Sequence, residues 1–108
     1  MVEFLSTATL PDEYQQLAKT VRDFAREVVA PVSAKHDAEH SFPYEVVAGM
    51  AEMGLFGLPF PEEYGGSGMS MLEGVVVYEE FGRSLAPSPH FASSVVSASA
   101  LLAAGSDE

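Results

Sequence analysis

The longest uncharged stretch of this chain lies near its C-terminal end, and it constrains the fold more than any other feature. No charged residue occurs between Arg83 and Asp107. Ser88 and Pro89 supply a helix cap and a first-turn proline, and Gly105 supplies a stop. The stretch "HFASSVVSASALLAA" between them therefore predicts a helix with small or apolar side chains on every face. A helix of this kind has to be covered all round, and we expect another domain or subunit to cover it.

The N-terminal third of the chain predicts two further helices. Apolar residues between positions 11 and 29 recur at three- and four-residue spacing, which indicates one buried stripe on a helix. Pro11 suits the first turn of that helix, because its missing N–H would have no partner there. Pro31 should break or kink the helix, and a shorter helix is predicted over 32–39.

Two more helices are indicated by their capping residues. The segment 44–53 carries valines and methionines on one side, and Gly54 after it suits a left-handed C-terminal cap. Ser70 and Glu73 form the S-x-x-E capping box at the start of the next helix. We therefore expect residues 1–108 to form one all-α domain, a small up-and-down bundle of about five helices, with residues 1–9 as a flexible lead.

Composition excludes several classes of partner. The 108 residues carry a formal net charge of -11, which disfavours binding to nucleic acids and to anionic membranes. The absence of cysteine removes disulfides and thiolate chemistry. No apolar run approaches the ~20 residues of a membrane span, and the N-terminus lacks a basic leader. The sequence thus predicts no membrane span and a cytoplasmic location.

The connector "LPFPEEYGGSG" at 58–68 raises the question of phosphate binding. A phosphate loop needs a lysine followed by Ser or Thr, or a G-x-G-x-x-G between strand and helix, and neither pattern is present. The helix that follows carries Glu73 in its first turn, which would repel a phosphate. We therefore interpret the glycines as turn residues that reverse the chain, some of them with positive φ.

Other candidate sites are weaker. "HDAEH" at 36–40 fits the zinc-peptidase pattern H-x-x-E-H, so a zinc hydrolase using His36, Glu39 and His40 stays as an alternative. No third metal ligand is evident, and our leading interpretation therefore predicts no metal site. No G-x-S-x-G elbow accompanies the serines at 84–99. The acid pairs 62–63 and 79–80 are predicted to face solvent, the second with Arg83 one turn away as a surface partner.

Several longer stretches resemble the N-terminal helical domain of the acyl-CoA dehydrogenase family. They read "FAREVVAPVSAKHD", "FPYEVVAGMAEMGLFGLPFPEEYGGSGMS", "YEEFGRSLAPSP" and "LLAAGSDE". The resemblance covers residues 10–108, and its most specific part is the pattern G-L-x-G-L-x-x-P-E-E-Y-G-G-x-G at 54–68. In that family a β-domain and a C-terminal helical bundle follow the helical domain, so the resemblance implies a larger flavoprotein, with the present chain ending where a further helix should begin.

The resemblance also implies a function. It implies an FAD-dependent α,β-desaturation of an acyl-CoA thioester, with an electron-transfer flavoprotein as electron acceptor and with other domains or subunits of a homo- or hetero-oligomer completing the enzyme. The catalytic glutamate and most FAD contacts of the family lie outside these residues, so we assign no catalytic, cofactor-binding or metal residue here. The uncharged helix is the expected wall of the acyl pocket. The residues we predict for its ligand-facing side are Phe91, Ser94, Val95 and Ala98.

The alternative from another class is an acidic helical module without catalytic activity, which binds a partner protein through the uncharged helix. The stretch "LAPSPHFASS" departs from the commonest members of the family. Chain length and branching of the substrate, and the activity of a divergent paralogue, therefore stay open at the level of sequence.

Overall fold

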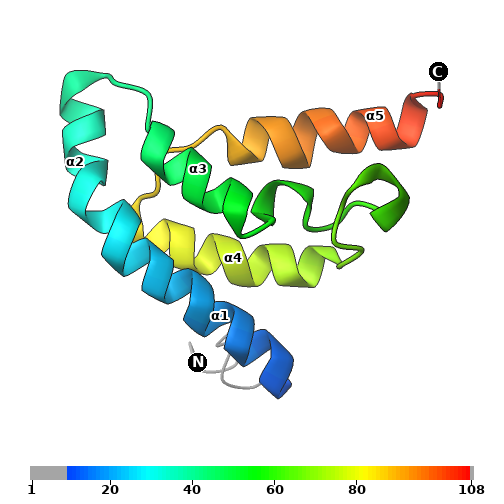
Figure 1. The fold of residues 1–108 in the computed structure, drawn as a ribbon, viewed down its shortest axis with the longest axis horizontal. Coiled ribbons are helices and arrows are strands. Elements are labelled where there is room, and N and C mark those ends of the chain that lie inside the picture. Colours follow the sequence, from blue (N-terminus) through cyan, green and yellow to red (C-terminus); the bar gives the residue numbers. More distant parts are fainter. Residues whose placement is uncertain (1–9, 108) are drawn as a thin grey trace.

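The computed structural model of the protein describes residues 10–107 and consists of helices joined by short connections (Figure 1). These described residues contain no strand, which confirms the predicted all-α class. The α-helices are α1 (Asp12–Phe24), α2 (Ala30–Glu39), α3 (Tyr44–Glu52), α4 (Met71–Ser84) and α5 (Ala98–Ala104). The predicted flexible lead at residues 1–9 lies outside the described part of the chain.

The first two helices form one bent rod (Figure 1). A π-helical turn, Ala25–Val29, joins α1 to α2, and the Ala30 N–H donates to the carbonyl of Ala25 five residues back. Pro31 accounts for this wide turn, because it has no N–H to donate and its ring crowds the carbonyl four residues earlier. The predicted kink is confirmed, but the helix continues through it and the distortion lies in the turn that ends before the proline.

The hydrophobic core lies where α1 crosses α4 and where both meet α3 and the 3₁₀ turn Leu55–Gly57. Its buried members are Val21, Val29, Val46, Met50, Leu55, Leu58, Val77 and Phe81. Burial of each such side chain contributes about 1.5–3 kcal/mol to folding. In the view of Figure 1, α3 and the connector that follows it lie between α4 and α5, so this core holds α5 only indirectly.

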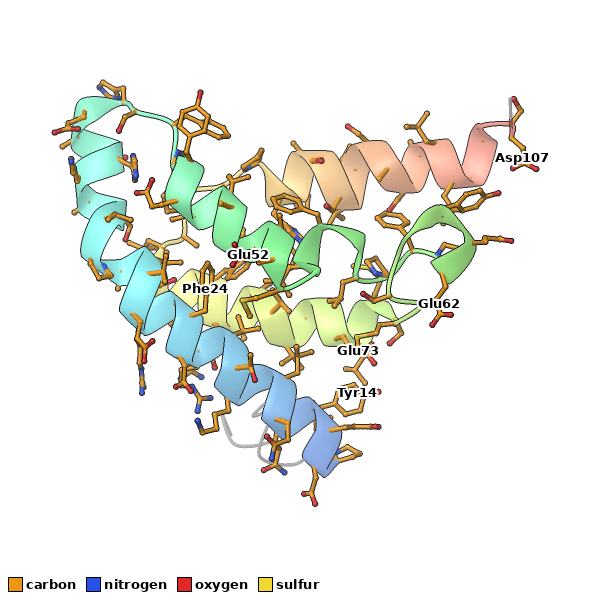
Figure 2. The ribbon with its side chains drawn as sticks, in the orientation of Figure 1. Tyr14, Phe24, Glu52, Glu62, Glu73 and Asp107 are labelled. Carbon is orange, nitrogen blue, oxygen red and sulfur yellow. The ribbon has the colours of Figure 1, made fainter. Side chains whose placement is uncertain are left out.

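The predicted caps are present in the structure. Gly54 after α3 adopts φ 72°, the left-handed conformation expected of it. At the start of α4 the Ser70 hydroxyl accepts the Leu72 N–H at 3.2 Å, and the Glu73 carboxylate accepts the Ser70 N–H at 2.8 Å. Tyr14 of α1 points toward Glu73, and its nearby hydroxyl helps the hydrogen bond from Ser70 to lower the pKa of that carboxyl, so the capping box also faces α1 (Figure 2).

One acid predicted to face solvent lies inside the fold. The Glu80 side chain is 2 % exposed, and its Oε1 accepts the Nη2 and Nε groups of Arg22 on α1 at 2.8 and 3.1 Å. Glu79 pairs with Arg83 at 2.7 Å, as expected. The prediction for Glu80 is therefore wrong, because α1 crosses α4 on the side of Glu80 and supplies a partner 58 residues away in sequence.

Candidate functional site

The uncharged C-terminal segment forms one helix over residues 90–104, called here the last helix. Its first part is a π-helical stretch, Phe91–Ser97, which continues directly into α5. The Ser88 hydroxyl accepts the His90 N–H at 3.3 Å, and the helix ends before Gly105. The cap and the stop expected from the sequence are both confirmed, although the π-helical geometry of the first half was not foreseen.

The last helix is exposed along most of its length. From residue 91 to residue 107 only Ser94 is buried. Large apolar side chains stand open to solvent on this helix, with exposed fractions of 60 % for Phe91, 53 % for Val96 and 71 % for Leu101. The other described elements therefore do not cover the outer side of the helix, as its composition led us to expect.

The four residues predicted to face a ligand do not share one surface. Ser94 is buried, and Val95 and Ala98 are half-buried. Phe91 is exposed and lines a hollow beside α4, whereas Ala98 lines a separate pocket beside the connector. The structure thus places the four on one helix, but it brings Phe91 and Ala98 to two different hollows and Ser94 and Val95 to neither, and their contact with a ligand stays a prediction.

The first hollow lies between the connector and the second half of the last helix. This pocket has a volume of about 340 Å³, and its apolar walls are Phe60, Tyr64, Ala98, Leu101 and Leu102. At its edge the Tyr64 hydroxyl donates to the Asp107 carboxylate at 2.7 Å (Asp107 is labelled in Figure 2). This hydrogen bond raises the pKa of Tyr64, because only the protonated phenol can donate it.

The second hollow lies at the start of the last helix. It has a volume of about 440 Å³, and its walls include Tyr78 and Phe81 of α4, Leu85 and Ala86 after α4, and Phe91. Leu85 adopts a positive φ of 49°, which turns the chain away from α4 after its last residue. Both hollows are thus walled mainly by apolar side chains, the property that suits a hydrocarbon group.

His90, at the start of the last helix, is the polar residue that sequence reasoning missed. Its ring is buried and contacts the rings of Phe56, Tyr78 and Phe81, with centroid distances of 5.2, 5.4 and 6.0 Å. Nε2 lies 2.7 Å from the carbonyl oxygen of Leu55, and Nδ1 lies 2.6 Å from the Tyr78 hydroxyl.

The partners of His90 define its hydrogen-bonding roles. A carbonyl oxygen only accepts, so Nε2–H is the donor to Leu55, and in the neutral ring Nδ1 accepts the Tyr78 hydroxyl. Burial raises the pKa of Tyr78, which keeps that hydroxyl protonated and able to donate. A single histidine in an otherwise uncharged segment was the one sequence signal that could have pointed to this arrangement.

The connector uses its own N–H groups internally. Those of Gly66, Ser67 and Gly68 donate to carbonyl oxygens of Pro61, Gly57 and Phe60 at 3.1, 3.0 and 2.8 Å. Gly65 and Gly68 have positive φ values of 84° and 65°. Because these donors are already satisfied, the loop does not present them to a phosphate, and its interpretation as a chain reversal is confirmed.

The histidine pair of the zinc alternative is not arranged around a common point. His36 Nδ1 contacts the Ser41 hydroxyl at 2.7 Å, and Nε2 contacts the Glu45 carboxylate, so both ring nitrogens have protein partners. The proximity of His36 lowers the pKa of Glu45. His40 ends α2 in a left-handed conformation. Within residues 10–107 no three His, Asp or Glu side chains are grouped to hold a metal ion.

The fold and the last helix define an all-α domain with an uncharged outer wall and a rigid proline–glycine connector. The chain belongs to the acyl-CoA dehydrogenase family: the family described as "Acyl-CoA dehydrogenase, N-terminal domain" matches residues 11–108. The chain is 42 % identical over 77 residues to the mitochondrial short-chain specific acyl-CoA dehydrogenase of Sus scrofa, an alignment that covers 71 % of this chain and 19 % of the relative.

Two relatives with other names show comparable similarity. The chain is 44 % identical over 75 residues to the acryloyl-CoA reductase (NADH) of Anaerotignum propionicum, covering 69 % of this chain and 19 % of that protein. It is also 44 % identical over 77 residues to the glutaryl-CoA dehydrogenase of Desulfococcus multivorans, covering 68 % and 20 %. The chain therefore spans about a fifth of the length of these relatives. None of the helices within residues 10–107 combines the length and the apolar character that crossing a bilayer requires.

Proposed function

We propose that the chain is the N-terminal domain of an FAD-dependent acyl-CoA dehydrogenase that introduces an α,β double bond into an acyl-CoA thioester. Membership of the family supports this, as do relatives that are named as dehydrogenases of acyl-CoA compounds. In this proposal the domain supplies one wall of the acyl pocket and packs against the rest of the enzyme, and it has no catalytic activity alone.

The observation that carries the proposal is the exposed uncharged side of the last helix. Phe91, Val96 and Leu101 are exposed apolar side chains of this uncharged helix, and two hollows with mainly apolar walls lie beside it. An acyl chain gains free energy from such a surface at roughly 25 cal/mol for each Å² removed from water. The thioester and the nucleotide part of the substrate are proposed to bind elsewhere in the protein.

FAD is proposed to bind mainly to other parts of the protein. When bound, a flavin supplies the acceptor for a hydride equivalent. The glycine-rich connector does not fit the flavin pyrophosphate, because the N–H groups of residues 65–69 already donate to carbonyl oxygens of the loop and its flanks. The contribution of this chain to catalysis is thus the exclusion of water from the acyl site and the orientation of the acyl chain.

Three further points complete the proposal, and the first two follow from the family resemblance. An electron-transfer flavoprotein would accept the electrons, and a homo- or hetero-oligomer would supply the remaining FAD contacts. A cytoplasmic location is also proposed. Reduction of a purified electron-transfer flavoprotein, light scattering of the holoenzyme and fractionation of the source cells would check these three points in turn.

The full-length protein provides the direct test. It should be yellow when purified, and anaerobic addition of a suitable acyl-CoA should bleach its flavin absorbance. The substrate series would include butyryl-CoA, octanoyl-CoA and glutaryl-CoA, chosen because relatives differ in the acyl groups that they are named for. A colourless protein that takes up no FAD would contradict the proposal.

A pair of matched variants tests the part played by the last helix. Val96→Lys places a charge on the outer side of that helix, whereas Val75→Lys places the same charge on α4 at a site of similar exposure, 61 % against 53 %. We expect Val96→Lys to raise KM for the acyl-CoA and Val75→Lys to leave it unchanged. Equal effects of the two variants would show that the last helix has no special relation to the acyl chain.

The exposed apolar helix also favours a second candidate, the acidic module that binds a partner protein. Sedimentation of the 108-residue chain separates the two candidates. A monodisperse monomer with slow amide exchange in the last helix would favour the module, because a domain that needs the rest of an enzyme should self-associate or show fast exchange there.

A further inference from the structure

We propose that His90 is a positioning residue that holds the last helix in place and thereby sets which acyl chain lengths the enzyme accepts. The inference rests on the proposed function, since it concerns the wall of the same acyl site. His90 joins three parts of the fold: the turn at Leu55, helix α4 through Tyr78, and the start of the last helix itself.

Apolar burial alone holds the last helix weakly. His90 and Ser94 are the only buried residues between positions 90 and 107, and they lie on one side of its first turns. The contact at the other end is the hydrogen bond between Tyr64 and Asp107, which is exposed and so competes with water. The position of the helix therefore depends strongly on the contacts of one side chain near its start.

The His90 contacts fix direction as well as distance. Three aromatic rings surround the imidazole, and its two nitrogens bind partners on different elements at 2.7 and 2.6 Å. Hydrogen bonds weaken steeply when they bend below about 120°, so the ring can neither rotate nor shift far without losing one of them. The first turn of the last helix is thus held in both rotation and tilt.

A small movement at His90 has a large effect at the other end of the helix. At ~1.5 Å per residue, the segment 90–104 is about 21 Å long, so a tilt of about 10° at His90 moves its end by about 4 Å. Phe91 lies beside one hollow, and Leu101 and Leu102 line the other. A change of tilt would therefore move Leu101 and Leu102 much further than Phe91 and change the size of the hollow beside the connector, which is how an acyl site would change its preferred chain length.

The test uses the full-length holoenzyme with three variants and two controls. His90→Phe keeps the ring but leaves the Leu55 carbonyl and the Tyr78 hydroxyl without their partner. His90→Gln can restore the donor to Leu55, and Tyr78→Phe removes only the hydroxyl. The controls are Tyr44→Phe and His40→Asn, which change exposed residues of the same two types. For each protein, kcat and KM are measured with butyryl-, octanoyl- and palmitoyl-CoA, and hydrogen–deuterium exchange is followed for residues 91–104.

His90→Phe should raise KM for the preferred substrate about tenfold, the equivalent of its two lost buried hydrogen bonds at roughly threefold each, and should change the order of chain-length preference. Its kcat should change less than about twofold, because the group does not touch the reacting atoms. Amide exchange in residues 91–104 should accelerate. His90→Gln should recover most of the wild-type KM, Tyr78→Phe should give a smaller change of the same kind, and both controls should match wild type.

Two outcomes would overturn the inference for His90. The first is an active His90→Phe enzyme with the wild-type chain-length profile and wild-type exchange. The second is loss of FAD and of kcat without recovery by His90→Gln, which would indicate a general role in folding. Failure of the proposed function would look different from both outcomes, because the wild-type protein itself would then oxidise none of the acyl-CoA substrates. In that case the role of His90 in chain-length specificity is refuted together with the proposed function.

Discussion

Replacement of Arg22 by methionine should lower the free energy of unfolding by about 3 kcal/mol at neutral pH. Methionine retains much of the apolar stem of arginine but leaves the carboxylate of Glu80 buried without a cation. Loss of one partner of a buried pair costs roughly 3–5 kcal/mol when both partners are buried. The lower end applies here, because the Glu80 side chain is 2 % exposed but that of Arg22 is 32 % exposed, so water can reach the site once the guanidinium is gone.

The intact Arg22–Glu80 pair contributes much less to the free energy of unfolding than the loss caused by Arg22→Met suggests. At a separation of 2.8 Å the attraction is about 6 kcal/mol with an effective dielectric constant of about 20, and the desolvation of Glu80 offsets most of it. The double variant Arg22→Met/Glu80→Gln has no buried charge. It should therefore be more stable than Arg22→Met alone. Relative to the wild type, its free energy of unfolding should be lower by about 1–2 kcal/mol, because the charged hydrogen bonds are missing.

The assay is urea denaturation of the chain followed by circular dichroism, with Arg83→Met as the matched control. Arg83 pairs with Glu79 at 2.7 Å on the surface of α4, where such pairs contribute less than about 1 kcal/mol. Equal losses for Arg22→Met and Arg83→Met would refute the reasoning from burial. A double variant as unstable as Arg22→Met would refute the view that the unpaired carboxylate causes the loss.

Four further substitutions give expected outcomes. The hydrogen bond from Ser70 lowers the pKa of Glu73 below its ordinary 4.5, so the ionised Glu73 side chain stabilises the fold above that pH. Glu73→Gln should therefore lower the free energy of unfolding at neutral pH. In acid-unfolding curves this difference from the wild type should vanish as the pH falls through the lowered pKa. Gly66→Ala places a Cβ 2.2 Å from a backbone carbonyl oxygen and should lower the free energy of unfolding, measured in urea, by about 1–3 kcal/mol. Gly82→Ala places its Cβ in open space on α4 and should raise the free energy of unfolding by up to about 1 kcal/mol. Leu101→Glu should change the stability of the chain by less than about 0.5 kcal/mol, because this side chain is exposed, but should impair assembly of the full-length enzyme.

The helices could be predicted from the sequence because their signals are local. Apolar spacing, the capping box at Ser70 and the left-handed Gly54 all act within a few residues, and the structure confirms them. Pro31 indicated the bend in the first rod, although a proline distorts the turn that precedes it and the π-helical segment therefore lies earlier in the chain. The burial of Glu80 could not be predicted, because its partner Arg22 comes close only when α1 crosses α4.

The sides of the last helix were harder to predict, because a helix without charged residues offers no contrast between inward and outward positions. His90 supplies the missing reference point. Because the ring of His90 is buried, the residues four and eight positions later should also face the protein interior. In the structure these residues are Ser94, which is buried, and Ala98, which is half-buried. The opposite side then carries Val96, which is 53 % exposed, whereas Leu101 lies one turn after Ala98 and lines the first hollow with it. A ligand or protein that approaches this helix from outside would therefore meet Val96 before it could reach Ser94.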